Sequence, residues 1–189
     1  GFAIEDGLID SLDKPIFDYF KDKIPKQGND ARKLKITIQD LLTMSSSLEC
    51  DDWNEASRGN EEKMYIIEDW SGFILSLPIR GIPPWKKTPE NSKYGRSFSY
   101  CTGGIQVLTE LVERVTEMKM SDYLQDKLFN PLGIKKPEFS YTPLGHTNGG
   151  GGAKLTSSDW IKIGQLMLNN GSFNDRKIMN ENWIKDKDF

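Results

Sequence analysis

The sequence predicts a mainly α-helical fold with few strands. Apolar residues recur at helical spacing directly after Gly104, at Ile105, Leu108, Leu111, Val112 and Val115. Two other segments begin with a threonine that an aspartate follows three residues later, at Thr37 and Thr156. This spacing is typical of a helix N-terminus, where the two side chains satisfy free backbone N–H groups. Strand-like runs of alternating polarity are scarce, so we expect six or seven helices.

Turn and capping residues predict where the helices begin and end. The first residues have the pattern of the last turns of a helix that ends at Gly7, and a short helix is expected from Pro15 through Phe20. Residues 61–77 are expected to form one helix. Ser121 is expected to cap another helix that ends before Pro131.

The helix after Thr156 is expected to bury Trp160, Ile163 and Met167 and to end at Gly171. Residues 21–35 are predicted to form a surface loop, and residues 49–59 an acidic, irregular segment. Residues 78–94 contain four prolines and Trp85, which favours an extended loop over the surface. Such a loop is often functional, so Trp85 is a candidate substrate-binding residue; packing its own loop against the fold explains it equally well.

Length and composition indicate a single domain over residues 1–189. The chain has 37% hydrophobic and 28% charged residues, as expected for a globular protein, and a net charge of −3. It has no long basic run, which argues against nucleic-acid binding. No apolar stretch approaches the roughly 20 residues that a membrane-spanning helix requires. The composition leaves the compartment open between cytoplasmic and periplasmic or extracytoplasmic.

Cysteine and histidine usage argues against a bound metal. Cys50 and Cys101 can pair only if the fold brings their Cα atoms within about 7 Å. Cys101 is otherwise a small packed residue or a reactive thiol. His146 is the only histidine and no Cys-x-x-Cys spacing occurs, so neither a metal nor a cofactor is predicted.

The stretch Phe98-Ser99-Tyr100-Cys101-Thr102-Gly103-Gly104 precedes the longest expected helix. A helix N-terminus presents free N–H groups and a positive potential, which suits a group that holds or receives negative charge. Tyr100 is therefore a candidate functional residue, and a packed core tyrosine is the simpler alternative. A second flexible turn, at residues 149–152, would let backbone approach ligand closely; it lacks the Gly-Lys-Ser/Thr of a phosphate loop.

Several segments resemble, in order and spacing, the serine β-lactamase-like family, which includes class C β-lactamases, penicillin-binding proteins, D-alanyl-D-alanine carboxypeptidases and related esterases and amidases. They are residues 3–13, residues 36–45, Phe98-Ser99-Tyr100, Pro131-Leu132-Gly133-Ile134 and Gly150-Gly151-Gly152. The resemblance covers essentially the whole chain. It implies the helical part of an α+β β-lactamase/transpeptidase-like fold, with the N- and C-terminal sheet strands missing. An incomplete domain would expose an apolar face, so we expect self-association or a partner chain that supplies the missing strands.

The resemblance also implies the chemistry. The family uses a Ser-x-x-Lys nucleophile, a Tyr-x-Asn motif and a Lys-Thr-Gly-like strand, and a serine hydroxyl needs a neighbouring base to become a nucleophile. Tyr100 takes the position of that base, and Thr102 stands where the family usually has asparagine. Threonine offers one hydroxyl instead of an amide donor and a carbonyl acceptor, which puts β-lactam hydrolysis in doubt more than ester or amide hydrolysis. Together with Trp85, Gly150 and Gly151 are the expected contacts to a small-molecule or peptide-like acyl substrate.

The other two motifs are not found. By the family's spacing, Ser-x-x-Lys would precede Gly1 and the third motif would follow Phe189. Ser11-Leu12-Asp13-Lys14 has the right letters but lies in a turn before Pro15, where the serine and the lysine do not share a helical face. The sequence thus predicts part of a serine hydrolase that acts through an acyl-serine, inactive as a segment. A non-catalytic binding or sensor domain that kept the fold is the alternative.

Overall fold

The computed structural model describes residues 1–26, 30–80 and 98–185. Within these ranges, helices dominate and the strands form only a two-stranded antiparallel hairpin. No helix there is long and apolar enough to cross a membrane. The elements are α1 (Phe2–Glu5), η1 (Ile16–Asp18), η2 (Lys21–Lys23), η3 (Lys33–Lys35), α2 (Ile38–Leu42), α3 (Glu61–Met64), α4 (Trp70–Ser76), α5 (Thr102–Thr116), α6 (Met120–Leu124), the π-helical turn η4 (Gln125–Phe129), α7 (Ser157–Leu168), β1 (Ser172–Phe173), β2 (Arg176–Lys177) and α8 (Asn182–Lys185).

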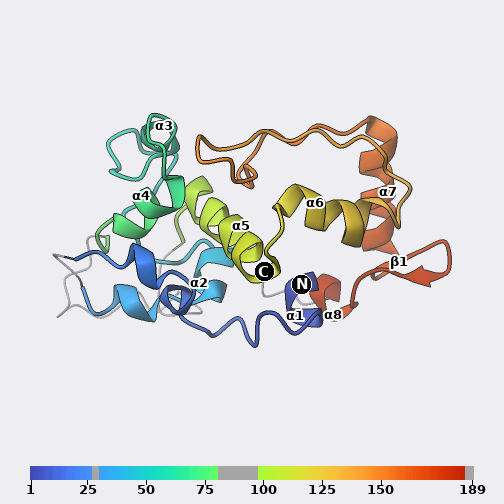
Figure 1. The fold of residues 1–189 in the computed structure, drawn as a ribbon, viewed down its shortest axis with the longest axis horizontal. Coiled ribbons are helices and arrows are strands. Elements are labelled where there is room, and N and C mark those ends of the chain that lie inside the picture. The colour runs from blue at the N-terminus through green and yellow to red at the C-terminus, as the bar shows by residue number, and fades with distance from the viewer. Residues whose placement is uncertain (27–29, 81–97, 186–189) are drawn as a thin grey trace.

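Helix α5 lies in the middle of the fold and contacts α1, α2, α3, α4 and α6 (Figure 1). It is 15 residues long and begins at Thr102, inside the stretch that the sequence places before the helix. Of the apolar positions that predict this helix, Leu111 is almost fully buried, and Leu108 and Val115 pack against the larger core. Val107, which is not among those positions, is fully buried as well. Gly103 allows α4 to approach closely, because a Cβ at this position would overlap with the side chain of Ile74.

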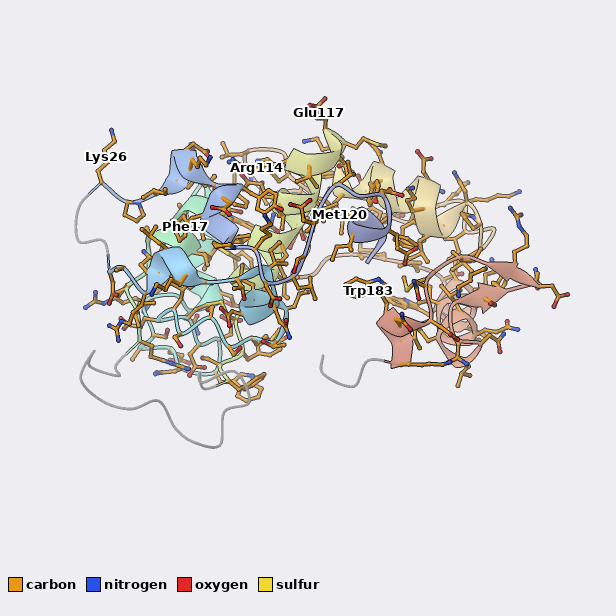
Figure 2. The ribbon with its side chains drawn as sticks, turned by 90° about the horizontal axis from the view of Figure 1, so that it is seen from below. Phe17, Lys26, Arg114, Glu117, Met120 and Trp183 are labelled. Carbon is orange, nitrogen blue, oxygen red and sulfur yellow. A yellow bond between two sulfur atoms is a disulfide. The ribbon has the colours of Figure 1, made fainter. Side chains whose placement is uncertain are left out.

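The described residues form two apolar cores. The larger one packs α1, α2 and α4 against α5 and includes Phe20, Ile36 and Ile74. The smaller one gathers Phe129, Leu132, Ile134 and Leu166 between η4 and α7. In Figure 2, Phe17 and Arg114 lie to the left of Trp183 of α8. The segment between η4 and α7 reaches back over α5, and isolated bridges join Glu138 to Lys154 and Tyr141 to Thr147 across it (Figure 1).

Several predicted boundaries are confirmed. Gly7 follows α1 with a φ of +72°, a conformation that favours glycine at a helix end. At the start of α2, the hydroxyl of Thr37 accepts the N–H of Asp40 (3.1 Å), and the Asp40 carboxylate accepts the N–H of Thr37 (2.9 Å). Gly171 has a φ of +86° just beyond α7. The helix expected after Pro15 is shorter than predicted, a 3₁₀ turn.

The single helix predicted over residues 61–77 is wrong. α3 ends at Met64 and α4 begins at Trp70. The Asp69 carboxylate accepts the N–H of Gly72 (2.8 Å), and the Trp70 indole N–H donates to the carbonyl of Ile67 (2.9 Å). The apolar spacing spans both helices, but the capping aspartate starts a new helix in the middle of it.

Two further expectations need correction. Ser121 lies inside α6 and does not cap it; the Glu113 carboxylate of α5 accepts the N–H of Met120 (2.9 Å) at the start of α6 instead. Residues 21–35 are not simply a surface loop, because the described part contains η2 and η3 and buries Lys33.

The buried face predicted for α7 is also wrong in part. Trp160 is 53% exposed and Met167 is 45% exposed, whereas Leu166 is buried and Ile163 packs against the smaller core. α7 carries apolar residues on more than one face, so spacing alone does not select the face that packs. The outward face, with Ile161 and Leu168, is solvent-accessible.

Candidate functional site

Tyr100 lies immediately before α5 and is partly exposed, with 39% of its surface accessible. Its ring stacks on Trp53, with 5.6 Å between the ring centroids and 3° between the planes. Trp53 itself is 79% exposed. Tyr100 is therefore not the packed core residue of the simpler alternative, and within the described residues the structure records no hydrogen bond to its hydroxyl.

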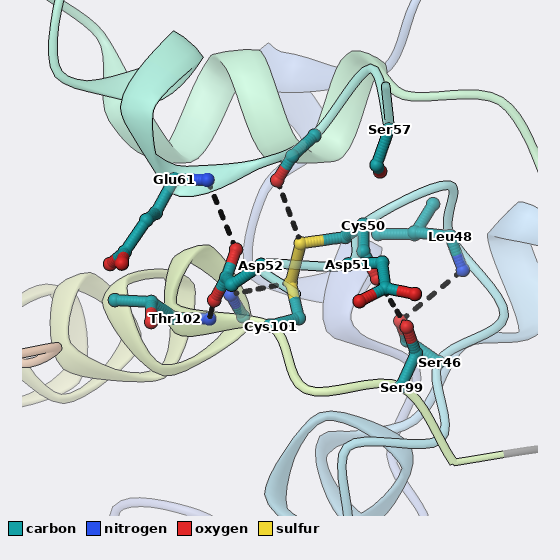
Figure 3. The surroundings of a disulfide bond; sticks show 12 residues. Ser46, Leu48, Cys50, Asp51, Asp52, Ser57, Glu61, Ser99, Cys101 and Thr102 are labelled. Carbon is teal, nitrogen blue, oxygen red and sulfur yellow. Dashed lines mark hydrogen bonds between the residues drawn. A yellow bond between two sulfur atoms is a disulfide. The ribbon is translucent and has the colours of Figure 1, made fainter. Parts of the chain in front are cut away.

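The backbone around Tyr100 is held by residues 50–52 (Figure 3). The N–H of Asp52 donates to the carbonyl of Tyr100 (3.0 Å), and the Asp52 carboxylate accepts the N–H of Thr102 (2.6 Å). The hydroxyl of Ser99 donates to the carbonyl of Cys50 (2.6 Å). Hydrogen bonds on both sides of residue 101 fix the position of this segment.

A disulfide bond between Cys50 and Cys101 completes the clamp, with 5.5 Å between the Cα atoms. This distance is within the limit of about 7 Å between Cα atoms that a disulfide requires. Cys101 is neither a reactive thiol nor a free packed residue. Its sulfur instead accepts the N–H of Gly104 (3.3 Å) in the first turn of α5.

Asp52 is the residue of this site that the sequence did not single out. Its second carboxylate oxygen accepts the N–H of Glu61 (3.0 Å), so one side chain caps both α3 and α5. The sequence around Asp52 is acidic, and its apolar residues do not recur at helical spacing. Because its partners lie 9 and 50 residues away, no local capping pattern reveals it.

Thr102 is the first residue of α5 and is buried, with 6% of its surface accessible. The structure places Gly150 beside it: a Cβ at Gly150 would overlap with the Thr102 methyl group. Gly151 has open space around its Cα. The described residues provide no hydrogen bond to the Thr102 hydroxyl. Trp85 lies outside the described residues.

The turn that carries Gly150 is docked on α5 by buried polar side chains. The Gln106 amide donates to the carbonyl of Thr147 (3.1 Å) and accepts the N–H of Gly149 (3.0 Å). One oxygen of the Glu113 carboxylate accepts both the N–H (2.9 Å) and the hydroxyl (2.8 Å) of Thr147. These bonds set how closely Gly150 approaches Thr102.

Glu113 also contacts the histidine of the chain, with 2.6 Å between its second oxygen and Nδ1 of His146. Burial alone would raise the pKa of Glu113. The N–H groups of Met120 and Thr147, together with His146, outweigh burial and lower that pKa below its ordinary value. Glu113 is thus a charged anchor at the point where α5, α6 and the Gly150 turn meet.

Ser11 and Lys14, which have the Ser-x-x-Lys spacing, lie in a turn and not on a helix. The Ser11 hydroxyl accepts the N–H of Asp13 (3.1 Å), and Lys14 pairs with Asp10 (3.3 Å) rather than with the serine. Among the described residues, no group of three or more His, Cys, Asp or Glu side chains is placed to hold a metal ion.

The chain is similar to known proteins in sequence and in fold. The sequence model of the Beta-lactamase family matches residues 3–181. The bovine (Bos taurus) mitochondrial serine β-lactamase-like protein LACTB is 27% identical over 183 residues, which cover 84% of this chain and 31% of that protein. A candidate 6-aminohexanoate-dimer hydrolase of Bacillus anthracis superposes with a TM-score of 0.68 at 20% identity, covering 97% of this chain and 47% of that one. A penicillin-binding protein of Bacillus halodurans gives 0.65 at 20% identity, with 97% and 58% covered.

The two solved structures are too distant in sequence to indicate more than a shared fold. The chain spans about a third of the length of the mitochondrial relative and about half of each solved chain. The family model, by contrast, extends over almost all of the 189 residues and includes Tyr100, Thr102 and Gly150. The chain belongs to the Beta-lactamase family.

Proposed function

We propose that this chain is the central, helical part of a serine hydrolase that transfers an acyl group from an ester, amide or β-lactam to water. Tyr100 is the general base. It takes the proton of a serine hydroxyl while the serine oxygen attacks the carbonyl carbon. The same proton then passes to the leaving group as the acyl-serine forms, and water releases the acid in a second, equivalent step.

One observation carries this proposal. The Tyr100 phenol is partly exposed and receives no hydrogen bond from the described residues, while its backbone is clamped at the positive end of a 15-residue helix. A base has to be accessible to its substrate and fixed in direction. Thr102 and Gly150 lie together beyond it, where the Thr102 hydroxyl would orient the substrate or the leaving group.

The proposal concerns the whole protein. The Ser-x-x-Lys of this sequence, at Ser11 to Lys14, lies in a turn, and its serine and lysine do not pair in the described structure. The proposal therefore assigns the nucleophile and its lysine to sequence outside these 189 residues. We expect the 189-residue chain on its own to be inactive, because loss of the nucleophile removes covalent catalysis. A small-molecule or peptide-like acyl compound remains the expected substrate, and no step requires a cofactor.

The test compares two tyrosine variants of the whole protein, assayed with p-nitrophenyl butyrate and a chromogenic cephalosporin. Tyr100→Phe is expected to lower kcat/KM about 100-fold or more, the usual contribution of a general base. Tyr65→Phe is the control, because Tyr65 has a similar exposure but donates its hydroxyl to Glu61 (2.9 Å). Wild-type kcat/KM in Tyr100→Phe would overturn the assignment, as would turnover by the 189-residue chain.

A non-catalytic binding or sensor domain is the second candidate, and the burial of Thr102 favours it. A threonine whose methyl group packs against Gly150 offers substrate a single hydroxyl where the family usually offers an amide. The sequence encoded immediately upstream of Gly1 discriminates between the two candidates. A Ser-x-x-Lys there supports the enzyme, and its absence supports the binding domain.

A further inference from the structure

Trp53 is an exposed tryptophan that stacks on Tyr100. It is 79% exposed, yet one face of its ring lies parallel to Tyr100, the proposed base. Isolated exposed apolar residues are common and need no explanation. This one stands beside the residue on which the proposed chemistry depends, and its other face is free to receive a ligand.

The turn that carries Trp53 is held by hydrogen bonds from its own backbone and from Asn60. The Trp53 N–H donates to the Asp51 carboxylate (3.1 Å). The buried Asn60 amide donates to the carbonyls of Asp51 (3.4 Å), Asp52 (3.0 Å) and Asn54 (3.4 Å), on both sides of Trp53. An aromatic ring on a fixed turn loses little conformational freedom when a ligand stacks on it, which is what a binding surface requires.

From this arrangement we propose that Trp53 and Tyr100 form a platform that binds a planar aromatic group of the substrate. The inference rests on the proposed function and narrows its substrate to esters or amides that carry such a group. The charge around the platform narrows the substrate further, because Asp51 and Asp52 directly precede Trp53 and Glu55 lies two residues after it. A neutral or cationic aromatic group is therefore preferred over an anionic one.

Binding is measured on the whole protein labelled with 5-fluorotryptophan, by ¹⁹F NMR. The resonance of Trp53 is identified by its loss in Trp53→Phe, and that of Trp160 by its loss in Trp160→Phe. Trp160 is the matched control, because it is 53% exposed on α7 and has no aromatic stacking partner among the described residues. Phenylacetamide is expected to shift the Trp53 resonance saturably and to leave Trp160 in place. Cyclohexylacetamide, of similar size but not planar, and the anion phenylacetate are expected to bind more weakly.

Turnover is measured with two ester pairs that differ only in the ring. The pairs are methyl phenylacetate with methyl cyclohexylacetate, and benzyl acetate with cyclohexylmethyl acetate. In at least one pair, kcat/KM should favour the phenyl compound, and Trp53→Ala should reduce that preference about threefold to tenfold, mainly through KM. Trp53→Phe should retain most of the preference, and Trp160→Ala all of it.

The outcomes separate this inference from the proposed function. If neither these esters, p-nitrophenyl butyrate, phenylacetamide nor the chromogenic cephalosporin is turned over but phenylacetamide still shifts Trp53 alone, the hydrolase proposal fails and the aromatic site stands. If esters are hydrolysed while the Trp53 resonance does not move, or Trp53→Ala keeps the wild-type preference in both pairs, the aromatic site is overturned and the hydrolase stands. Equal shifts of Trp53 and Trp160 would also overturn it, because they indicate general association with exposed indoles.

Discussion

The carboxylate of Asp52 accepts the backbone N–H of Thr102 at 2.6 Å, across 50 residues of sequence. The same carboxylate accepts the N–H of Glu61 at 3.0 Å. One side chain thus joins the start of α5 to the start of α3 and fixes the backbone on which Tyr100 stands (Figure 3). The site therefore depends on a contact that lies outside every recognisable motif.

Removal of the Asp52 carboxylate should destabilise the protein. Asp52→Ala leaves the N–H groups of Glu61 and Thr102 without their acceptor, and we expect the free energy of unfolding to fall by about 2 kcal/mol. Asp52→Asn retains one acceptor oxygen and should lose about half as much. The measurement is urea denaturation followed by circular dichroism.

Asp51→Ala is the control for this series. Asp51 is the adjacent aspartate, and its carboxylate accepts only the local N–H of Trp53 among the hydrogen bonds recorded for the described residues. Its replacement should cost less than Asp52→Ala. Equal midpoints for Asp52→Ala and the wild type would contradict the double-capping role.

The disulfide should be a second source of stability. Cys50 and Cys101 are 51 residues apart, and a cross-link over a loop of that length stabilises by about 4 kcal/mol in the chain-entropy model. Reduction with dithiothreitol should therefore lower the urea midpoint. It should have no effect on a double Cys50→Ala, Cys101→Ala variant. Alkylation of both cysteines in the unreduced, unfolded protein would show that the bond is absent.

Sequence reasoning located the elements whose signals are local. The apolar spacing from Ile105 to Val115 lies within α5 itself. The reciprocal cap of Thr37 and Asp40 stands at the start of α2, and Gly7 stands at the end of α1. Local signals also located the stretch around Tyr100. They did not reveal Asp52, whose hydrogen-bond partners are contributed by other segments.

The errors have the same origin. Trp160 and Met167 have the right spacing for a buried face of α7, but the smaller core accepts only the stripe with Ile163 and Leu166. Phe129 and its neighbours in the smaller core select the stripe that packs. These residues lie outside α7, so the apolar spacing within α7 does not reveal them. Ser121 looks like a cap, yet Glu113 from the preceding helix provides the acceptor.

Gly150 should tolerate no larger residue. Gly150→Ala would push its methyl group into that of Thr102, a buried, β-branched side chain that has little freedom to move aside. We expect a loss of about 1 to 3 kcal/mol in unfolding free energy, as for other overpacked positions, together with reduced kcat/KM of the whole protein. Gly151→Ala should be neutral in unfolding free energy, because nothing lies within 4 Å of the added Cβ. A neutral Gly150→Ala would show that the turn is not docked on Thr102.

Glu113 predicts how stability depends on pH. Its pKa in the folded protein lies below the ordinary value of 4.5, since burial, which raises it, is outweighed by the N–H groups of Met120 and Thr147. The carboxylate therefore contributes its full stabilisation above about pH 4.5, and the contribution is lost as the pH falls through the lower folded-state pKa.

Glu113→Gln should lower stability at pH 7 by about 2 kcal/mol, because the charge-assisted hydrogen bonds become neutral ones. It should also flatten the fall in stability below pH 4.5, because the replaced group no longer titrates there. Urea midpoints measured from pH 7 to pH 3 test both effects, with Glu117→Gln as the control on an exposed carboxylate four residues further along. A Glu113→Gln curve parallel to that of the wild type would show that the acid sensitivity arises elsewhere, for example at Asp6, Asp22 or Asp69, whose pKa values are also lowered.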